Sequence, residues 1–523
     1  IISKSFLFIL LHKTKSFEKN KNMYEILDRV KKLQDEFKDN ESLKVRKFFA
    51  FDKEFALIFL ESFADFDVIS KDIIAPIINS NENFLKKSDD RHIILNENTP
   101  KEQNLSEFVA YKILYASELS LSSRQEDLIN KLTRGQKVLL IDGCKDAIII
   151  DTKKIEKRTI MEPPNNNILR GPREGFVEDL NSNMNLIRKR LVTNDLKIET
   201  MEIGRFTKSK VAICYLTKIA DKKVVKQIKK RLSQIDIDGI VDSYYLQDFL
   251  EEKPTSLFKQ IGWTEKPDIL TGKMLEGRVA LIVDGSPIAL TVPFILIEDL
   301  QSAGDYYEEN NSVTFVRLLR FSGLFIALTM PGIYIAMQLY HYKALPLKFL
   351  VTIINSSQNI PMPPAIEVLF AFFMFEILYE ASVRTPKSLG SSFNIIGALI
   401  LGDTAVKSNL ASAPTIMIVA LSSIAIYLIP EGTNVMRLLR FFITLMATII
   451  GVVGICLALV FVISYLSDFD SYGADYLSPL APYKKQDFKD SLYKSNIKSL
   501  KTRPVSFKQK NLVRQGKKND SEN

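Results

Sequence analysis

Five charged side chains in the C-terminal half of the chain border or interrupt long apolar runs: Glu367, Glu376, Glu380, Arg384 and Asp403. Carboxylates in such positions normally face a bundle interior or a watery cavity, because exposure to lipid at a helix centre costs about 2.5 to 3.5 kcal/mol. Repeated around a ring of subunits, such side chains would attract cations. The alternative is that Glu367 and Asp403 are solvated at the ends of apolar segments, and the sequence favours neither interpretation.

The spacing of Glu376, Glu380 and Arg384 is that of successive helical turns. Glu380 and Arg384 are therefore predicted to pair along one helix face, with the acid on the favoured N-terminal side. For Glu380 this interfacial ion pair is preferred over a role in a pore. Glu376, like Glu367 and Asp403, has no obvious basic partner in the local sequence, so these three are the candidate pore or membrane-embedded carboxylates.

The segment that carries these residues has the composition of a membrane domain. Residues 321–466 hold seven of the 70 Lys and Arg residues and five of the 61 Asp and Glu residues. Charge-free runs long enough to cross a bilayer core of about 30 Å are the mark of a spanning helix. The predicted spans lie near 321–340, 365–383, 388–402, 408–430 and 441–466. If both ends of the domain lie on one side of the membrane, one run is re-entrant, or 388–430 crosses once as a broken helix.

Small residues at four-residue spacing recur in these runs and allow helices to approach closely. Packing within one subunit is as compatible with them as packing between subunits. The pairs are Ala398 with Gly402, Ala447 with Gly451, and Gly454 with Ala458.

Basic residues set the expected orientation. Arg317 and Arg320 precede the first span, and the residues after Leu466 carry twelve basic and seven acidic side chains of a chain whose net charge is +9. Lys and Arg beside spans favour the cytoplasmic side, and a basic segment there favours anionic lipid. We expect both ends of the membrane domain to be cytoplasmic, and we do not expect binding to nucleic acid.

The first 300 residues are predicted to form a two-part α/β (α+β) region. Residues 24–120 mix apolar and charged positions at helical spacing, with Tyr24, Leu27, Val30 and Leu33 on one stripe, which predicts an α-rich module. Asp142-Gly143 and Asp284-Gly285 each separate two β-branched runs, as in hairpins. Between the hairpins the pattern predicts a helix over 175–191, strands near 196–203 and 210–216, and a helix over 222–233. These elements and both hairpins are expected to close one α/β module.

The expected architecture is thus an α/β region followed by an all-α polytopic membrane domain of about four or five helices and a basic tail. The expected divisions are a start-site extension over 1–22, an amphipathic α-rich subdomain over 23–130, an α/β subdomain over 131–300, a membrane domain over 301–466 and a basic cytoplasmic tail over 467–523.

Motifs for catalysis are missing from the sequence. It has no P-loop, no G-x-S-x-G, no H-E-x-x-H and no C-x-x-C pattern. The histidines His12, His92 and His341 are far apart, and the three cysteines are too scattered for a disulfide framework. We therefore expect a protein that is not an enzyme and that has no cofactor and no metal site.

The densest polar segment lies at residues 169–191. Glu174, Glu178 and Asp179 come at the predicted start of a helix and Arg188 and Arg190 at its end, where each favours the nearby end of the helix dipole. The functional alternative is that Arg173 and Glu178 form an ion-pair surface for a neighbouring subunit.

This segment resembles the A subunit of the GerA-type spore germination receptors, and the resemblance covers roughly residues 130 to 504 in colinear order. It continues through Lys266-Pro267-Asp268, Val283-Asp284-Gly285-Ser286-Pro287, Arg317-Leu318-Leu319-Arg320 and Pro479-Leu480-Ala481-Pro482. Tyr379 stands where the family pattern has Arg, which puts a charge-pair role of that position in doubt. The signature or subunit-interface residues are Arg173, Glu174, Gly175, Phe176, Glu178, Asp179, Asn185, Arg188, Arg190, Glu276, Gly277 and Arg278.

The resemblance implies a subunit of a nutrient-sensing complex in the inner membrane of a spore. It further implies a permease-like B subunit, a lipoprotein C subunit, and a homo-oligomeric ring of A subunits that forms a nutrient-gated cation channel. The alternatives are a secondary transporter, which would need a midplane substrate site and usually inverted repeats, and a non-conducting membrane scaffold.

Overall fold

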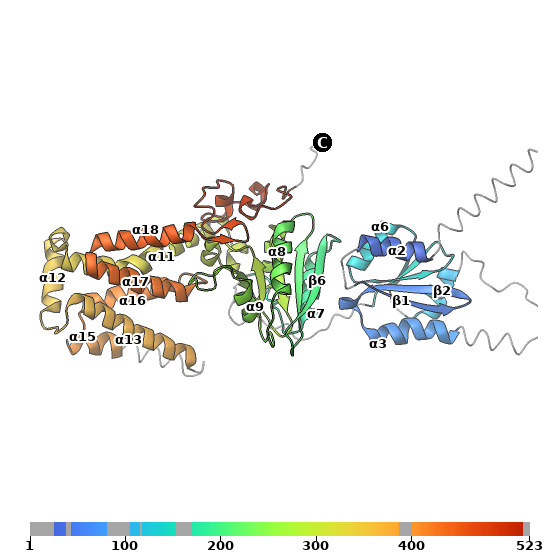
Figure 1. Cartoon of the computed structure of the whole chain (residues 1–523), viewed down its shortest axis with the longest axis horizontal. Coiled ribbons are helices and arrows are strands. Elements are labelled where there is room, and N and C mark those ends of the chain that lie inside the picture. The colour runs from blue at the N-terminus through green and yellow to red at the C-terminus, as the bar shows by residue number, and fades with distance from the viewer. Residues whose placement is uncertain are drawn as a thin grey trace, which may run out of the picture. The chain divides into compact units, whose positions relative to one another are not determined.

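The computed structural model describes residues 26–37, 43–80, 105–115, 118–152, 170–385 and 400–515. The chain divides into two compact units. The first comprises residues 1–167, 172–250 and 263–292 and contains two β-sheets, and the second comprises 168–171, 251–262 and 293–523 and is mostly helical (Figure 1). The prediction of an N-terminal α/β region followed by a mainly helical region is confirmed.

The first sheet has the strand order β1-β2-β4-β5-β3, and all its neighbours are antiparallel. Alternate residues of its central strands point to opposite faces, and both faces are covered by apolar side chains, so β4 and β5 are buried throughout. The strands are β1 (Leu43–Ala50), β2 (Lys53–Leu60), β3 (Leu119–Ser122), β4 (Lys137–Ile141) and β5 (Ala147–Ile150). The helical elements around them are α2 (Ile26–Glu36), α3 (Phe66–Val68), α5 (Leu105–Phe108), α6 (Gln125–Thr133) and the π-helical turns Ile69–Ile74 and Val109–Ile113.

The α-rich prediction for residues 24–120 is wrong in part, because β1, β2 and the start of β3 lie there. In β1 and β2 the mixture of apolar and charged positions reflects pairing along a sheet, with Phe48 opposite Phe55. The predicted stripe of α2 is also shifted. Ile26, Val30 and Leu33 are buried, whereas the Leu27 side chain is 60% exposed.

The second sheet has the order β6-β7-β9-β10-β8. The strands are β6 (Leu196–Ile203), β7 (Ser209–Leu216), β8 (Gly262–Thr264), β9 (Val279–Val283) and β10 (Ala289–Val292), and the helices are α7 (Leu180–Arg190), α8 (Lys222–Ser233), α9 (Ser243–Leu250) and α10 (Pro267–Leu275). The predicted strands near 196–203 and 210–216 and the helix over 222–233 are confirmed. The helix predicted over 175–191 begins later, at Leu180, where Asp179 caps it.

Both predicted hairpins form, but they belong to different sheets. β4 pairs with β5 in the first sheet, and β9 pairs with β10 in the second. Each hairpin is extended by a strand from elsewhere in the chain, since Ile141 lies opposite Phe55 and Val283 lies opposite Val211. The single α/β module expected between the hairpins is therefore wrong, because these long-range pairings are not visible in local patterns.

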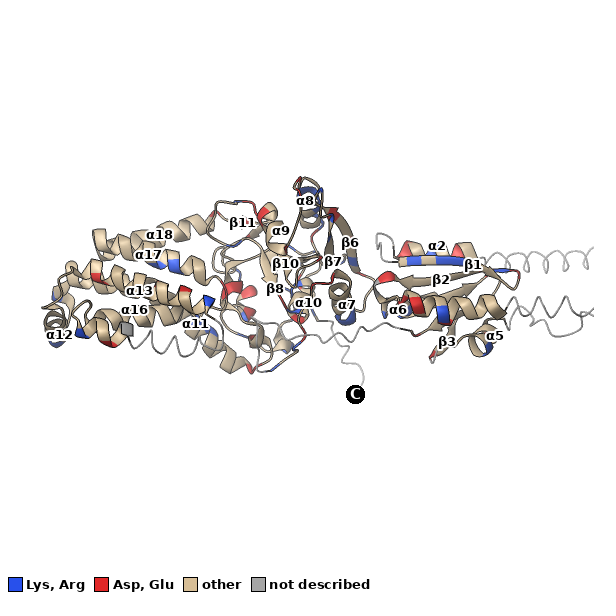
Figure 2. Cartoon of the chain, turned by 90° about the horizontal axis from the view of Figure 1, so that it is seen from below, with Lys and Arg blue, Asp and Glu red and all other residues tan. Residues whose placement is uncertain are grey.

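The second unit contains the helices of the predicted membrane domain, where charged residues are sparse (Figure 2). Among the described residues, α11 and α17 are long and apolar enough to cross a membrane, and α12, α16 and α18 are shorter apolar helices. The helices are α11 (Asn310–Leu339), α12 (Leu347–Ser357), α13 (Pro364–Arg384), α15 (Ala405–Lys407), α16 (Ala413–Ile426), α17 (Thr433–Ile450) and α18 (Val452–Ser467). The run at 388–402 lies almost wholly outside the described residues.

The single span predicted over 441–466 is wrong, because α17 and α18 are separate antiparallel helices. Gly451 stands between them with φ +70°, a conformation that glycine adopts without steric cost. The Phe442 and Phe461 rings lie with their centroids 6.3 Å apart across the hairpin. The helices approach so closely that a Cβ atom at Gly454 would lie 2.1 Å from the Met446 carbonyl oxygen.

The residues predicted as a basic tail are folded as part of the second unit as far as Gln515. They form the short pair β11 (Asp470–Ser471) and β12 (Ala474–Asp475), followed by 3-10 turns, and they bury Tyr476, Leu500 and Phe507. Part of the basic charge is used within the fold, since Lys484 pairs with Asp475 at 2.7 Å.

Candidate functional site

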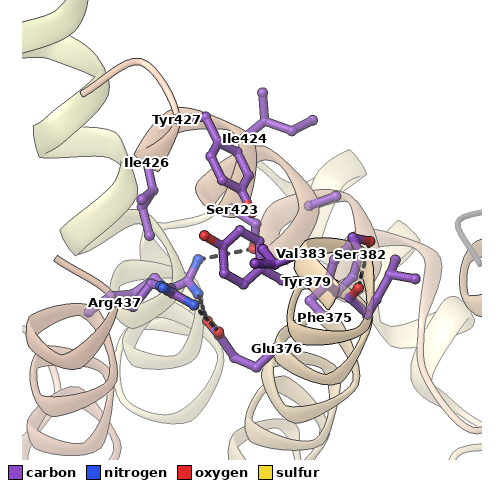
Figure 3. Close-up of a pocket in the computed structure, with 13 residues that line it drawn as sticks. Phe375, Glu376, Tyr379, Ser382, Val383, Ser423, Ile424, Ile426, Tyr427 and Arg437 are labelled. Atoms are coloured by element: carbon purple, nitrogen blue, oxygen red, sulfur yellow. Dashed lines mark hydrogen bonds and ion pairs between the residues drawn. The ribbon is translucent and has the colours of Figure 1, made fainter. Parts of the chain in front are cut away.

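Charged side chains from two helices meet within the second unit (Figure 3). Glu376 of α13 accepts hydrogen bonds from Arg437 and Arg440 of α17, each with an N–O distance of 3.0 Å. Arg440 also donates to the hydroxyls of Ser422 and Ser423 on α16, at 3.3 and 3.0 Å. We call Glu376, Arg437 and Arg440 the Glu376 site.

A cavity of about 450 Å³ adjoins the Glu376 site. Tyr379 and Tyr427 contribute a ring pair with centroids 5.7 Å apart, and the Arg437 guanidinium lies 4.2 Å from the Tyr379 ring centroid. The cavity is lined by Phe375, Glu376, Leu378, Tyr379, Ser382, Val383, Ala420, Ser423, Ile424, Ile426, Tyr427, Arg437 and Arg440. Such a mixture places polar and charged groups at one spot on otherwise apolar helices, where charges usually mark an ion or substrate path.

Burial within the Glu376 site is unequal. The exposed fraction of the side chain is 4% for Arg440, 21% for Arg437 and 38% for Glu376. Since a buried cation needs a counter-ion, Glu376 is the group that makes the position of Arg440 tolerable. The sequence pointed to Glu376 but missed both arginines, which lie 61 and 64 residues further along the chain. The sequence feature that could have indicated these partners is the presence of two arginines three positions apart in an otherwise apolar helix.

The carboxylate of Glu367 is buried, with the residue 2% exposed. Its Oε1 atom accepts hydrogen bonds from the backbone N–H and the hydroxyl of Ser412, both at 2.6 Å. The Thr415 hydroxyl next to Ser412 donates to the phenol oxygen of Tyr334 at 3.2 Å. Glu367 is therefore an interior residue that joins α13 to the N-terminus of α16, and not a solvated residue at the end of a span.

The other predicted carboxylates lie at the surface of the second unit. Glu380 pairs with Arg384 at 2.6 Å, as the helical spacing predicts, and both side chains are more than half exposed. Asp403 pairs with Lys407 at 2.5 Å and is 57% exposed, so the expectation that it lacks a nearby basic partner is wrong. For Asp403 the interpretation as a solvated residue fits the structure.

Some of the predicted small residues lie at helix contacts, and others do not. Ala447 and Ala458 are buried, and a Cβ atom at Gly332 of α11 would lie 3.1 Å from the Ala447 Cβ atom. Gly451 ends its helix, so it does not form one packing face with Ala447. Gly402 has no atom of the described residues within 4 Å of a Cβ placed on it, and Ala398 lies outside the described residues.

The predicted entry to the first helix is fixed by ion pairs. Asp305 accepts from Arg317 at 3.1 Å and from Arg320 at 2.7 and 3.0 Å. Arg317 also donates to the backbone and side chain of Asp490, at 2.8 and 3.3 Å. Burial raises the pKa of Asp490, and the neighbouring Arg317 acts in the opposite direction. The folded C-terminal segment thus holds the start of α11.

Comparison with known proteins decides the family. The family model described as Bacillus/Clostridium GerA spore germination protein matches residues 31–506. The chain belongs to the GerA family. It is similar to spore germination protein KA of Bacillus subtilis, with 34% identity over 464 residues that cover 88% of this chain and 82% of that protein. It is also similar to spore germination protein B1 of Bacillus subtilis, with 34% identity over 76% of this chain and 82% of that protein.

A solved structure also resembles this GerA-family chain. It is the N-terminal domain of the A subunit of the Bacillus megaterium spore germinant receptor GerK3, at 27% identity with a TM-score of 0.38. The match covers 52% of this chain and 96% of that one.

The signature segment of the GerA-family chain is held on α7 in a way that the sequence did not predict. Asp179 caps the helix by accepting from the Ser182 backbone N–H at 2.7 Å, as expected of an acid at a helix start. Glu174, however, pairs with Lys189 at 2.8 Å and Arg190 at 2.5 Å, at the opposite end of the helix. The hydrogen bond from Lys189 holds the pKa of Glu174 below its ordinary value, and Arg190 adds to the effect. The expectation that Glu174 favours the start of the helix is wrong.

The other signature residues of the GerA-family chain divide between interior and surface. Arg188 is buried beside Cys214, and burial lowers the pKa of Arg188 to about 10 and raises that of Cys214 to about 12. Gly175, Phe176, Gly277 and Arg278 are buried, Asn185 and Glu276 are partly buried, and Arg173 and Glu178 are exposed. Arg278 lies 3.2 Å from Glu276. The sequence missed Asn183, whose amide exchanges two hydrogen bonds with the Val177 backbone and shapes the segment before α7.

No group of three or more His, Cys, Asp and Glu side chains that could hold a metal ion occurs in the parts of the GerA-family chain that the structure describes. The arrangement of the Glu376 site fits charge stabilisation within a helix bundle.

Proposed function

We propose that this GerA-family chain is the membrane subunit of a spore germinant receptor and that it responds to nutrients by opening an oligomeric cation channel. The observation that carries the proposal is the Glu376 site, where a carboxylate and two guanidiniums meet among apolar helices. Ionisable residues inside a membrane domain are costly and are retained mainly along ion paths or in charge pairs that hold helices together.

Two carboxylates have different parts in this proposal. Glu376 is 38% exposed at the cavity, so a change in its pairing with Arg437 would alter the charge that a passing cation meets. Glu367 is buried and engaged by Ser412, and it holds α13 against α16. We assign Glu376 to the response and Glu367 to the packing of the bundle.

The proposed setting is the inner membrane of the spore, with the N-terminal region and the tail in the cytoplasm, the membrane domain over 301–466 and the folded tail after it. Arg317 and Arg320 before the first span support this orientation. The proposed partners are a permease-like B subunit, a lipoprotein C subunit and further copies of this chain in a ring. Arg173 and Glu178, which are exposed, are the proposed contact surface for a neighbouring subunit.

The test is to co-express the chain with the products of its neighbouring genes, determine the oligomeric state, and record nutrient-dependent cation flux across a membrane. A ring with flux that depends on nutrient supports the proposal. A monomer that takes up a substrate in a saturable way supports a secondary transporter instead, and a ring without flux under any nutrient supports a scaffold.

A further inference from the structure

One segment of the helical unit is covalently bound at both ends to the sheet-bearing unit. Residues 251–262 pack within the helical unit, whereas the residues before and after them, up to Leu250 and from Trp263, belong to the unit with the sheets. Leu250 ends α9 and Trp263 lies in β8. The segment therefore follows α9 directly in the chain and leads directly into β8.

Lys259 of this segment makes a charged contact with two other parts of the helical unit. Its Nζ atom donates to the carboxylate of Glu431 and lies 3.7 Å from Asp299 Oδ1. The exposed side-chain fractions are 14% for Lys259, 26% for Glu431 and 6% for Asp299, so water screens the contact little. We call these three residues the Lys259 junction.

The backbone around Lys259 also makes hydrogen bonds to other parts of the helical unit. The Tyr476 hydroxyl donates to the Lys259 carbonyl oxygen at 2.7 Å, and the Ser471 hydroxyl donates to the Gln260 carbonyl oxygen at 2.9 Å. Phe258 is buried in one apolar cluster with Ile429, which lies just after α16. Residues 258–260 are thus packed and hydrogen-bonded within the helical unit.

The partner Glu431 belongs to the short connection between α16 and α17. Its backbone N–H donates to the Asp299 carbonyl oxygen at 3.3 Å. The next residue, Gly432, is the N-cap of α17 with φ +80°, and a Cβ atom there would lie 3.0 Å from Asp299 Oδ2. The junction therefore fixes the connection whose two flanking helices carry Ser423 and Arg437 of the cavity.

We propose that Lys259 is a positioning residue that holds the α16–α17 connection and, through it, the cavity side chains Ser423 and Arg437 beside Glu376. Loss of the Lys259 charge removes the cation that lies against both Asp299 and Glu431, which weakens the hold on the start of α17. The structural part of this inference stands without the proposed function, and only its effect on the nutrient response rests on it.

The structural part is tested by amide hydrogen exchange on the full chain in detergent, comparing Lys259→Met, Lys259→Arg and the control Lys253→Met. Lys253 lies in the same segment, but its side chain is 43% exposed and faces Asp468 at 3.4 Å. We expect Lys259→Met to speed exchange at residues 431–437 about tenfold, with the other two close to wild type. Unchanged exchange in Lys259→Met, or equal acceleration in Lys253→Met, would overturn the inference.

The functional part is tested by the nutrient response of the same variants in the assembled receptor. We expect at least about a tenfold loss for Lys259→Met and retention for Lys259→Arg and Lys253→Met. Glu431→Gln is a second variant. The double variant with Lys259→Met should show nearly the same exchange rate and nutrient response as either single variant, because both changes remove the same contact. If Lys259→Met exchanges faster but keeps the full nutrient response, the inferred effect of the Lys259 junction on the Glu376 site is wrong. Failure of the proposed function would appear separately, as a full response in Glu376→Gln.

Discussion

The guanidinium of Arg440 on α17 lies 3.0 Å from the carboxylate of Glu376 on α13, and the two residues are 64 positions apart in the chain. Arg440 is almost wholly buried, whereas Glu376 is not. Removal of the Glu376 carboxylate would therefore leave a buried cation without its counter-ion, whereas removal of the more exposed Arg437 would not.

Glu376→Gln should destabilise the helical unit by about 3 kcal/mol, because Arg440 would keep its charge without a counter-ion. Arg437→Gln should cost less than about 1 kcal/mol, since the inner pair of Glu376 and Arg440 stays intact. Thermal unfolding of the purified chain in detergent measures both. Equal losses would mean that the asymmetry in burial has no energetic consequence. The double change Glu376→Gln with Arg440→Met should recover part of the loss, because it removes the stranded charge.

Gly451→Ala should destabilise the α17–α18 hairpin by about 1 to 2 kcal/mol. The positive φ of Gly451 disfavours a side chain, and a Cβ atom there would lie 2.9 Å from the Tyr340 ring. Gly402→Ala is the matched control, because a Cβ atom at Gly402 meets no atom of the described residues within 4 Å. Thermal unfolding again provides the comparison, and an unchanged midpoint for Gly451→Ala would show that the two helices do not depend on this turn.

Glu174 should give the sheet-bearing unit a pH-dependent contribution of about 1 kcal/mol. Its pKa is lowered in the folded chain by Lys189 and Arg190. The folded state therefore binds the proton less readily than the unfolded state, so the stability is present above the ordinary carboxyl pKa of 4.5 and is lost as pH falls through the lower folded value. The difference in unfolding midpoint between wild type and Glu174→Gln should be clear at neutral pH and should shrink in acid. A difference that does not vary with pH would contradict this assignment.

Asp305→Asn should loosen the start of α11 and the folded C-terminal segment together. The side chain of Asp305 is 5% exposed and accepts from both Arg317 and Arg320, and Arg317 also pairs with Asp490. Limited proteolysis should cut residues 484–515 faster in this variant than in wild type. Asp403→Asn, which removes an exposed pair with Lys407, is the control and should leave the cleavage rate unchanged. Cleavage at the wild-type rate in Asp305→Asn would show that the segment is held by other contacts.

Local sequence patterns predict the helices, ion pairs and hairpins that are formed by residues close together in the chain. The helix over 222–233, the pairing of Glu380 with Arg384 and the two hairpins all follow from periodicity, turn residues or spacing over a few positions. The same logic failed where a contact joins distant segments. Local spacing cannot show that β4 pairs with β2 and that β9 pairs with β7, so it does not separate the two hairpins into different sheets.

The site shows the same division. Glu376 was identifiable because a lone carboxylate in an apolar run needs an explanation, but its partners Arg437 and Arg440 come from another helix. The sequence does not distinguish helix packing from a break at Gly451, because a glycine inside a charge-free run is compatible with both. Only its positive φ and the contact of Phe442 with Phe461 distinguish the two.

The central claim is that Glu376 takes part in a nutrient-dependent cation path, and the most direct test is flux through the assembled receptor with Glu376→Gln beside Glu380→Gln. Both changes neutralise a glutamate of α13, but Glu380 lies one turn further on and pairs with Arg384 at the surface. With assembly verified for each, we expect nutrient-dependent flux to fall about tenfold or more in Glu376→Gln and to stay at the wild-type level in Glu380→Gln. Equal, wild-type flux in both variants would contradict the account.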